Sequence, residues 1–180
     1  MNSAPTIEIA STCAGWSQLC PSAEELARDA AQLALVRGSA VLKLSWQRRV
    51  ELGIVLADAV EQQRLNRDHR GDDAPTNVLA FPAWEQGARV PAGAPVLLGD
   101  VVLALEVVGR EASEQDKPIT DHLRHLVVHG VLHLLGFDHL TPGEAEAMES
   151  LERSILAEFG IRDPYRDPPC LLEPMPAHHE

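Results

Sequence analysis

Three histidines in the second half of the chain constrain its fold more than any other feature. His129 and His133 are four residues apart, and His139 follows beyond Gly136. A helix has about 3.6 residues per turn, so the first two histidines lie on one helical face. Glycine readily adopts the left-handed conformation that ends helices, so the chain can turn at Gly136 and bring His139 back toward that face. The spacing predicts a helix, a turn and three converging imidazoles.

Three imidazoles that converge on one point are typical ligands of a transition-metal ion. Catalytic zinc sites have three protein ligands and leave the fourth position to water or substrate, whereas structural sites are closed by four ligands. The sequence therefore predicts one Zn²⁺ bound by His129, His133 and His139, with an open position. Nickel and copper remain alternatives, because three imidazoles also suit those ions.

Two further histidines, His122 and His125, precede this set. On a straight helix, His125 and His133 are about 12 Å apart at 1.5 Å per residue, whereas a zinc–nitrogen bond is about 2 Å long. One ion cannot bind both residues. We therefore expect His125 to pack in the core or to support the site from outside the ligand set.

The histidine spacing equals that of the metzincin protease signature, H-E-x-x-H-x-x-G-x-x-H. Those proteases use the glutamate after the first histidine as their general base. This chain has Gly130 at that position, and glycine has no group that transfers a proton. The difference argues against peptide hydrolysis and leaves the general base unidentified.

Length and composition restrict the protein class. The chain has 180 residues, 45% of them hydrophobic, which suits one globular domain. Its net charge of −12 argues against broad nucleic-acid affinity. The three cysteines form no C-x-x-C pair, which favours a reducing compartment. Neither a signal-peptide pattern nor an apolar run of about 20 residues is present, so we expect a cytoplasmic protein with no membrane partner.

Apolar periodicity and turn-forming residues predict alternating strands and helices. Strands are expected at 6–10, 52–56, 78–81 and 97–105, the last interrupted at Gly99-Asp100, while 41–46 is either strand or irregular. Helices are expected at 22–37, 59–70 and 107–115, from about 120 through the first two histidines, and from 141 to 160. Gly38 is expected to end the first helix, and capping boxes are expected at Ser22/Glu25 and Thr141/Glu144.

The predicted histidine helix is apolar on nearly all sides, and such a helix is buried in a protein core. Its apolar residues are Leu123, Leu126, Val127, Val128, Val131, Leu132, Leu134 and Leu135. We expect this helix to be central and rigid. Residues 1–166 are expected to form a single catalytic domain, and the proline-rich acidic residues 167–180 a flexible tail.

The segment His129–His139 resembles the H-G-x-L-H-L-x-G-[YF]-D-H signature of the YbeY family of bacterial metal-dependent endoribonucleases. A second block is similar to that family's L-N…R…P-T-[DN]-V-L-S-F-P: Leu65-Asn66, then Arg70, then Pro75–Pro82. Two shorter segments also match, Leu98-Gly99-Asp100 and Asp163-Pro164-Tyr165. The joint occurrence of these blocks is highly specific.

The resemblance covers roughly residues 50–166. The departures are the first fifty residues, which match poorly, the tail, Ala80 where serine is common and Phe137 where tyrosine is common. None of them falls on a candidate catalytic or ligand position.

The resemblance implies an α+β fold, a mixed sheet of about four strands packed with helices around a central metal-bearing helix. It implies zinc held by His129, His133 and His139, and an essential arginine that maps to Arg70. The implied function is a zinc-dependent, single-strand-specific endoribonuclease that processes the 3′ end of 16S rRNA and takes part in ribosome quality control. Implied partners are ribosomal RNA, a small-subunit ribosomal protein and an assembly GTPase.

Considered by itself, Arg70 has two interpretations. Its planar guanidinium matches phosphate oxygens, or it forms a surface ion pair with Asp72 or Asp73. The resemblance favours the first, which makes Arg70 and His129 the candidate catalytic residues. An alternative function is a non-catalytic ribosome assembly factor whose metal only stabilises the fold; an open ligand position next to Arg70 argues against it.

Two other side chains near these blocks have expected roles. Asp138 is expected to orient an imidazole, with general base as the alternative. Asn77 is expected to line the cleft or to cap the following strand.

Overall fold

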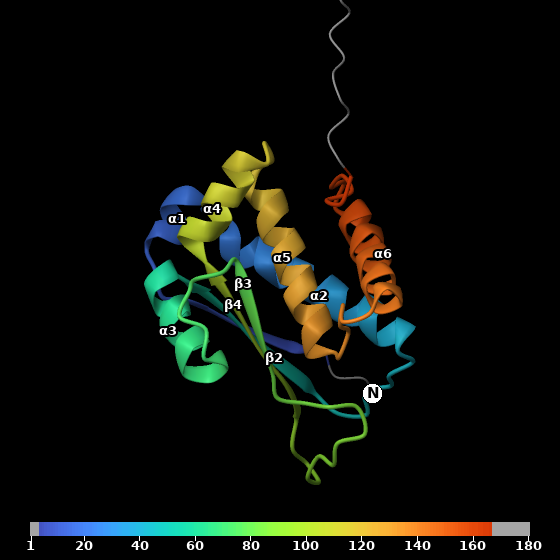
Figure 1. Ribbon diagram of the computed structural model, residues 1–180. Helices are drawn as coiled ribbons and strands as arrows, with labels where there is room; N and C mark the ends of the chain where they lie inside the picture. The colour runs from blue at the N-terminus through green and yellow to red at the C-terminus, as the bar shows by residue number, and fades with distance from the viewer. Residues whose placement is uncertain (1–3, 167–180) are drawn as a thin grey trace, which may run out of the picture.

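A four-stranded mixed sheet forms the centre of the protein (Figure 1). The computed structural model describes residues 4–166. The strands are β1 (Thr6–Ser11), β2 (Val50–Ala57), β3 (Val78–Pro82) and β4 (Val96–Ala104), in the spatial order β1-β2-β4-β3. β2 pairs in parallel with β1 and β4, and β3 runs antiparallel to β4. The predicted α+β fold with a mixed sheet of four strands is confirmed.

Six helices in the described residues cover the two faces of this sheet unequally. They are α1 (Gly15–Leu19), α2 (Ala23–Val41), α3 (Ala59–Arg70), α4 (Leu105–Glu114), α5 (Ile119–Leu134) and α6 (Pro142–Glu158). Figure 1 shows α2, α5 and α6 on one side of the sheet and α3 on the other. The main apolar core lies between the sheet, α2 and α5, and a small cluster around Ala57, Leu79 and Val102 lies on the α3 side.

Helix α5 lies at the centre of the main core, as its all-round apolar sequence predicts. It contacts α2, α4, α6, β3 and β4. Gly130 faces β4 so closely that an added Cβ would lie 2.6 Å from Val101 Cγ1. The position that carries the catalytic glutamate in metzincins is therefore a packing position here, directed at the sheet.

Two predictions about α2 are wrong. Gly38 does not end the helix, which continues to Val41; an added Cβ at Gly38 would lie 2.6 Å from Leu135, so this glycine allows α2 to approach α5. Ser22 precedes the helix but makes no capping hydrogen bond with its side chain. Packing against α5 explains Gly38, whereas Ser22, with a φ of −92° and a ψ of 11°, lacks the extended conformation typical of a capping residue.

The other element predictions agree with the structure in type, with small shifts in boundaries. The capping box of Thr141 and Glu144 is present at the start of α6. β4 is continuous rather than interrupted, because Gly99 adopts a φ of 124° and absorbs a shift in the register with β2 inside the strand. α4 begins at Leu105, earlier than expected, and 42–49 is irregular. The predicted tail, 167–180, lies outside the described residues, so the domain division stays a prediction.

Candidate metal centre and cleft

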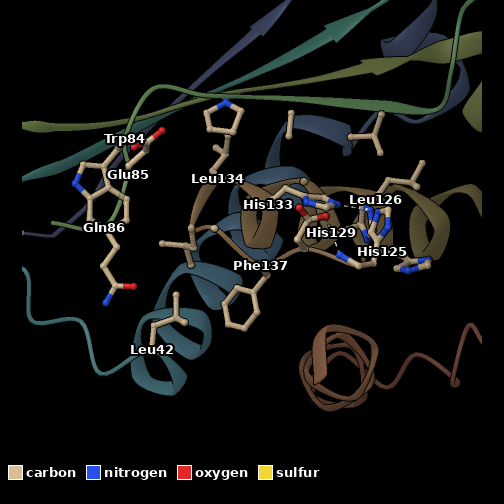
Figure 2. A pocket seen from close by; sticks show the side chains of 18 of the residues that line it. Leu42, Trp84, Glu85, Gln86, His125, Leu126, His129, His133, Leu134 and Phe137 are labelled. Atoms are coloured by element: carbon tan, nitrogen blue, oxygen red, sulfur yellow. Dashed lines mark hydrogen bonds between the residues drawn. The ribbon is translucent and has the colours of Figure 1, made fainter. Parts of the chain in front are cut away.

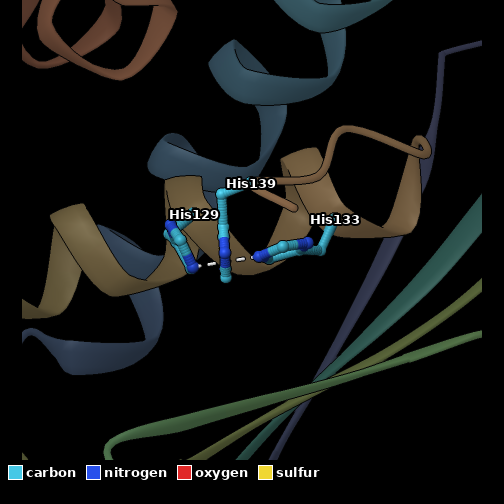
Figure 3. A group of neighbouring side chains, drawn as sticks. All are labelled: His129, His133 and His139. Carbon is cyan, nitrogen blue, oxygen red and sulfur yellow. Dashed lines mark hydrogen bonds between the residues drawn. The ribbon is translucent and has the colours of Figure 1, made fainter. Parts of the chain in front are cut away.

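The three histidines of the predicted ligand set converge (Figure 3). Each offers a ligand atom, and these atoms all lie within 4.8 Å of one another. His129 and His133 project from one face of α5, with their Nε2 atoms 3.0 Å apart. His139 approaches the pair from the loop that follows the helix, as the spacing predicts.

A Schellman-type end of α5 makes this loop turn back. Gly136 has a φ of 99°. Its backbone N–H donates to the carbonyl of His133 at 3.0 Å, and the N–H of Phe137 donates to that of Leu132 at 3.1 Å. Asp138 then accepts a hydrogen bond from the backbone N–H of His139 at 2.8 Å. Asp138 thus caps the loop backbone and, contrary to the expectation, makes no hydrogen bond to an imidazole among residues 4–166.

The carboxylate that does contact an imidazole of the predicted ligand set belongs to Glu152 of α6. Its Oε1 lies 2.6 Å from His129 Nδ1, its Oε2 lies 3.1 Å from His125 Nε2, and it also accepts a hydrogen bond from the Tyr165 hydroxyl. Burial alone would raise the pKa of Glu152, but the hydrogen bonds from His125 and His129 outweigh burial and lower it to about 2. Glu152 is therefore ionised, and Nδ1 of His129 carries the proton.

The charge state of the histidines suits metal binding. In the neutral imidazole of His129, an Nδ1–H donated to Glu152 leaves the lone pair on Nε2, the atom that faces His133. Burial, followed by the neighbouring His129 and His139, lowers the pKa of His133 to about 4, so His133 is neutral at neutral pH. Nitrogens bound tetrahedrally at 2.0–2.1 Å are roughly 3.4 Å apart, close to the 3.0 Å between the two Nε2 atoms. The donor set fits a single metal ion.

The histidines open into a cleft of about 810 Å³ (Figure 2). Figure 2 shows His125, His129 and His133 in one part of the cleft, and Trp84, Glu85 and Gln86 farther away. Arg70, at the end of α3, also lines this cleft. The structure thus brings both sequence blocks, the histidine signature and the arginine block, to one cavity.

Arg70 is held by the strand next to it. Its Nη2 donates to the carbonyl of Ala80 at 2.6 Å, and its Cζ lies 5.7 Å from the centroid of the Phe81 ring. Within residues 4–166 it forms no ion pair; Arg67 is the residue that pairs with Asp73, at 3.8 Å. The interpretation of Arg70 as a surface ion pair is therefore wrong, and most of its five donors are left for a ligand.

Asn77 lines the cleft and immediately precedes β3. Its Oδ1 accepts from the N–H of Val78 at 2.7 Å, and its Nδ2 donates to Glu111 Oε2 at 3.0 Å. The same oxygen of Glu111 lies 2.7 Å from Nε2 of the buried His122. Both polar atoms of Asn77 are thus occupied within the fold, and His122 belongs to this separate cluster rather than to the metal centre.

A family model described as "Endoribonuclease YbeY" matches residues 22–160. The chain belongs to the YbeY family. The matched range shows that the likeness begins well before residue 50, earlier than the sequence motifs indicate. No helix among residues 4–166 is long and apolar enough to cross a membrane.

Relatives named endoribonuclease YbeY cover nearly the whole chain. One from Paramagnetospirillum magneticum is 51% identical over 163 residues, which is 89% of this chain and 96% of the relative. Another, from Parvibaculum lavamentivorans, is 47% identical over 166 residues, 88% of this chain and 84% of the relative. The solution structure of TM1509 from Thermotoga maritima superposes with a TM-score of 0.50 at 23% identity, covering 90% of this chain and all of that one, and so supports the fold.

Proposed function

We propose that this chain is a zinc-dependent endoribonuclease that cuts single-stranded RNA and processes the 3′ end of 16S rRNA during ribosome maturation and quality control. Membership of the YbeY family supplies the reaction class, hydrolysis of a phosphodiester bond within RNA. The observation that carries the proposal is the convergence of His129, His133, His139 and Arg70 on one cleft.

The three histidines would hold the zinc ion through their ring nitrogens. A bound zinc ion polarises a phosphoryl oxygen and lowers the pKa of its water to about 7. Arg70 would bind the phosphate oxygens, because its guanidinium is a rigid fork of N–H donors and only one of them is used by the Ala80 carbonyl. Charge that develops on the phosphate oxygens would thus meet fixed donors.

Single-strand specificity is supported by the position of His129. The side chain of His129 is only 24% exposed, so a phosphate must enter the cleft to reach it. An unpaired strand can splay its bases and insert one phosphate, whereas a stacked A-form duplex holds its bases in place. Trp84 lines the same cleft and offers an aromatic surface for an unstacked base.

The charge of the protein supports a requirement for ribosomal partners. A net charge of −12 opposes long-range attraction of RNA. In the cytoplasm, where we propose that this chain acts, a small-subunit ribosomal protein or an assembly GTPase would bring the rRNA to the cleft. Adding small ribosomal subunits should then raise the cleavage rate above that of the naked RNA fragment.

The decisive experiment compares zinc-loaded protein with His133→Ala, purified identically, on a single-stranded rRNA fragment and on its duplex form. We expect the wild type alone to cut, and only the single strand. Equal cutting by both proteins would indicate a contaminating nuclease and contradict the proposal. No cutting by either, even with small subunits present, would favour the non-catalytic assembly factor, and cutting of casein instead of RNA would favour a protease.

A further inference from the structure

Glu152 is a carboxylate buried in the core, outside the predicted ligand set. Its side chain has 0% exposure, although it lies on α6 among the apolar residues Met148, Ile155 and Leu156. Burying a carboxylate is unfavourable unless hydrogen bonds and opposite charge compensate it, and an apolar residue would pack there with less penalty. Its presence therefore points to a role for the charge itself.

The three partners of Glu152 come from two segments that flank the metal centre. His129 and His125 are on α5, and Tyr165 follows α6. The two carboxylate oxygens have different partners, since Oε1 accepts from the ligand His129 while Oε2 accepts from His125 and Tyr165. His125 and Tyr165 thus hold one oxygen of the carboxylate, and the other oxygen is left to contact His129.

We infer that Glu152 is a positioning residue for the metal ligand His129, and that Tyr165 couples the segment after α6 to the metal centre by holding Glu152 in place. The inference rests on the proposed function only in taking the three histidines to bind zinc. Metal-binding histidines commonly donate their second ring N–H to a carboxylate, which fixes the tautomer and the ring orientation. Here that hydrogen bond is 2.6 Å long and leaves Nε2 directed at His133.

Tyr165 is well placed to make the second connection. Its ring stands edge-on to that of His125, with centroids 5.6 Å apart and an interplanar angle of 87°. Its backbone N–H donates to Asp163 Oδ1 at 2.9 Å, and Asp163 lies 4.0 Å from Arg153 of α6. The short segment after α6 is therefore folded against α5 and α6. The Tyr165 hydroxyl donates to the same oxygen of Glu152 that contacts His125.

The test measures zinc binding by the full chain, with Zn²⁺ itself as the probe in competition with a chelating dye. Glu152→Gln keeps the shape and hydrogen-bonding capacity of the side chain but removes the charge. We expect it to weaken zinc binding by about 10- to 100-fold, as is typical for loss of such a partner. Tyr165→Phe should weaken it by a smaller factor, and Glu146→Gln, an exposed residue of the same helix, should leave it unchanged.

A second readout separates positioning from mere stability. Long-range ¹H–¹⁵N spectra of the metal-free protein report which ring nitrogen of His129 is protonated. We expect Nδ1–H in the wild type and in Glu146→Gln, and a mixture of tautomers in Glu152→Gln. The Co²⁺ absorption spectrum of the loaded variants should change in the same order as their zinc affinities.

Unchanged zinc affinity and an unchanged His129 tautomer in Glu152→Gln would overturn the inference. A lower melting temperature of that variant with unaltered zinc affinity would also overturn it, because the role would then be structural only. If Tyr165→Phe binds zinc as the wild type does, the coupling to the last segment is refuted. Wild-type protein that binds zinc in this Glu152-dependent way but never cuts RNA would refute the proposed function alone.

Discussion

The two walls of the cleft are built in different ways. On the wall formed by α5, the imidazoles of His125 and His129 are both bound to the buried carboxylate of Glu152. On the wall formed by the end of α3 and by β3, Arg70 is exposed and is held by one hydrogen bond to the backbone of β3. Trp84 extends that wall in the long loop between β3 and β4.

This difference matches the demands of the two proposed ligands. A metal ion with bonds of about 2 Å tolerates little ligand movement, and on its wall one buried carboxylate holds two imidazoles. A single-stranded RNA varies in sequence and conformation, so its wall offers a free cationic fork and an aromatic ring. The comparison implies that metal affinity and RNA affinity can be changed separately.

Among the predictions, Arg70→Ala should have the largest effect. It tests whether RNA cleavage can be changed without changing zinc affinity. We expect cleavage of the single-stranded fragment to fall about 10²- to 10³-fold, the usual loss when one donor to the developing charge is removed. The zinc dissociation constant should stay within about twofold of the wild type. Arg64→Ala, on the same helix but outside the cleft lining, is the control for loss of charge. A large loss of zinc affinity in Arg70→Ala would show that the two walls are not independent.

A fall in pH should destabilise the metal-free protein, because His133 on the wall formed by α5 takes up a proton less readily in the folded state than in the unfolded state. The folded-state pKa of His133 is about 4, below its ordinary 6.5, so the unfolded chain binds more protons between these values and stability falls as the pH drops from 6.5 to 4. The loss is at most on the order of 3 kcal/mol for one such group. Glu152, with its pKa lowered from 4.5 to about 2, adds a further loss below pH 4.5.

Urea unfolding at several pH values in the presence of a chelator measures this dependence. His133→Asn should flatten the slope between pH 6.5 and 4, because it removes the titrating group. Arg70→Ala should leave the slope as it is in the wild type. An equal flattening in both variants would contradict the assignment of the acid sensitivity to the α5 wall.

Gly130→Ala tests how firmly α5 is seated on the sheet. The new methyl group would lie 2.6 Å from Val101 Cγ1, and overpacking of this kind destabilises by about 1–3 kcal/mol. The higher helix propensity of alanine offsets up to about 1 kcal/mol of this loss. Gly143→Ala, where nothing lies within 4 Å of the added atom, is the control in α6.

Chemical denaturation at constant zinc concentration gives the free energy of unfolding for each glycine variant. A second substitution, Val101→Ala, should recover part of the stability lost in Gly130→Ala, because the two side chains share one space. If Gly130→Ala is as stable as the wild type, β4 can shift to accommodate the added methyl group with little cost in the free energy of unfolding.

The convergence of the three histidines could be predicted from the sequence because its geometry is local. The helical period places His129 and His133 on one face, and the left-handed glycine at 136 turns His139 toward them. The position of Arg70 in the cleft could not be predicted in this way. That Arg70 reaches the same cleft depends on the packing of β3 against α5, which only the family resemblance implied.

Glu152 was missed for the same physical reason. Its contact with His129 depends on how α6 packs against α5, and no local pattern encodes that distance. A signal was nevertheless present: Glu152 follows Leu151 and lies among apolar residues that face the core, such as Met148 and Ile155. An acidic residue on a buried helix face needs partners, and the histidine helix was the obvious source.

Sequence proximity was misleading for Asp138. It is adjacent in sequence to His139, yet its carboxylate accepts a hydrogen bond from a backbone N–H.

Trp84→Ala should have the smallest effect of these substitutions. It tests directly whether the wall that carries Arg70 and Trp84 binds RNA. Stacking of one base on an aromatic ring contributes about 1–3 kcal/mol, and we expect the lower end, a loss of about fivefold in RNA affinity, because Trp84 is partly buried. Its ring lies edge-on to Trp46 at 5.2 Å, and Trp46 is fixed by a hydrogen bond to Ser39 at 2.8 Å, so the surface is preformed. KM should rise while kcat and zinc affinity stay constant, and Trp84→Phe should restore most of the binding. A fall in kcat with KM unchanged would mean instead that this loop positions the reacting phosphate, and the separation between the two walls would fail at that point.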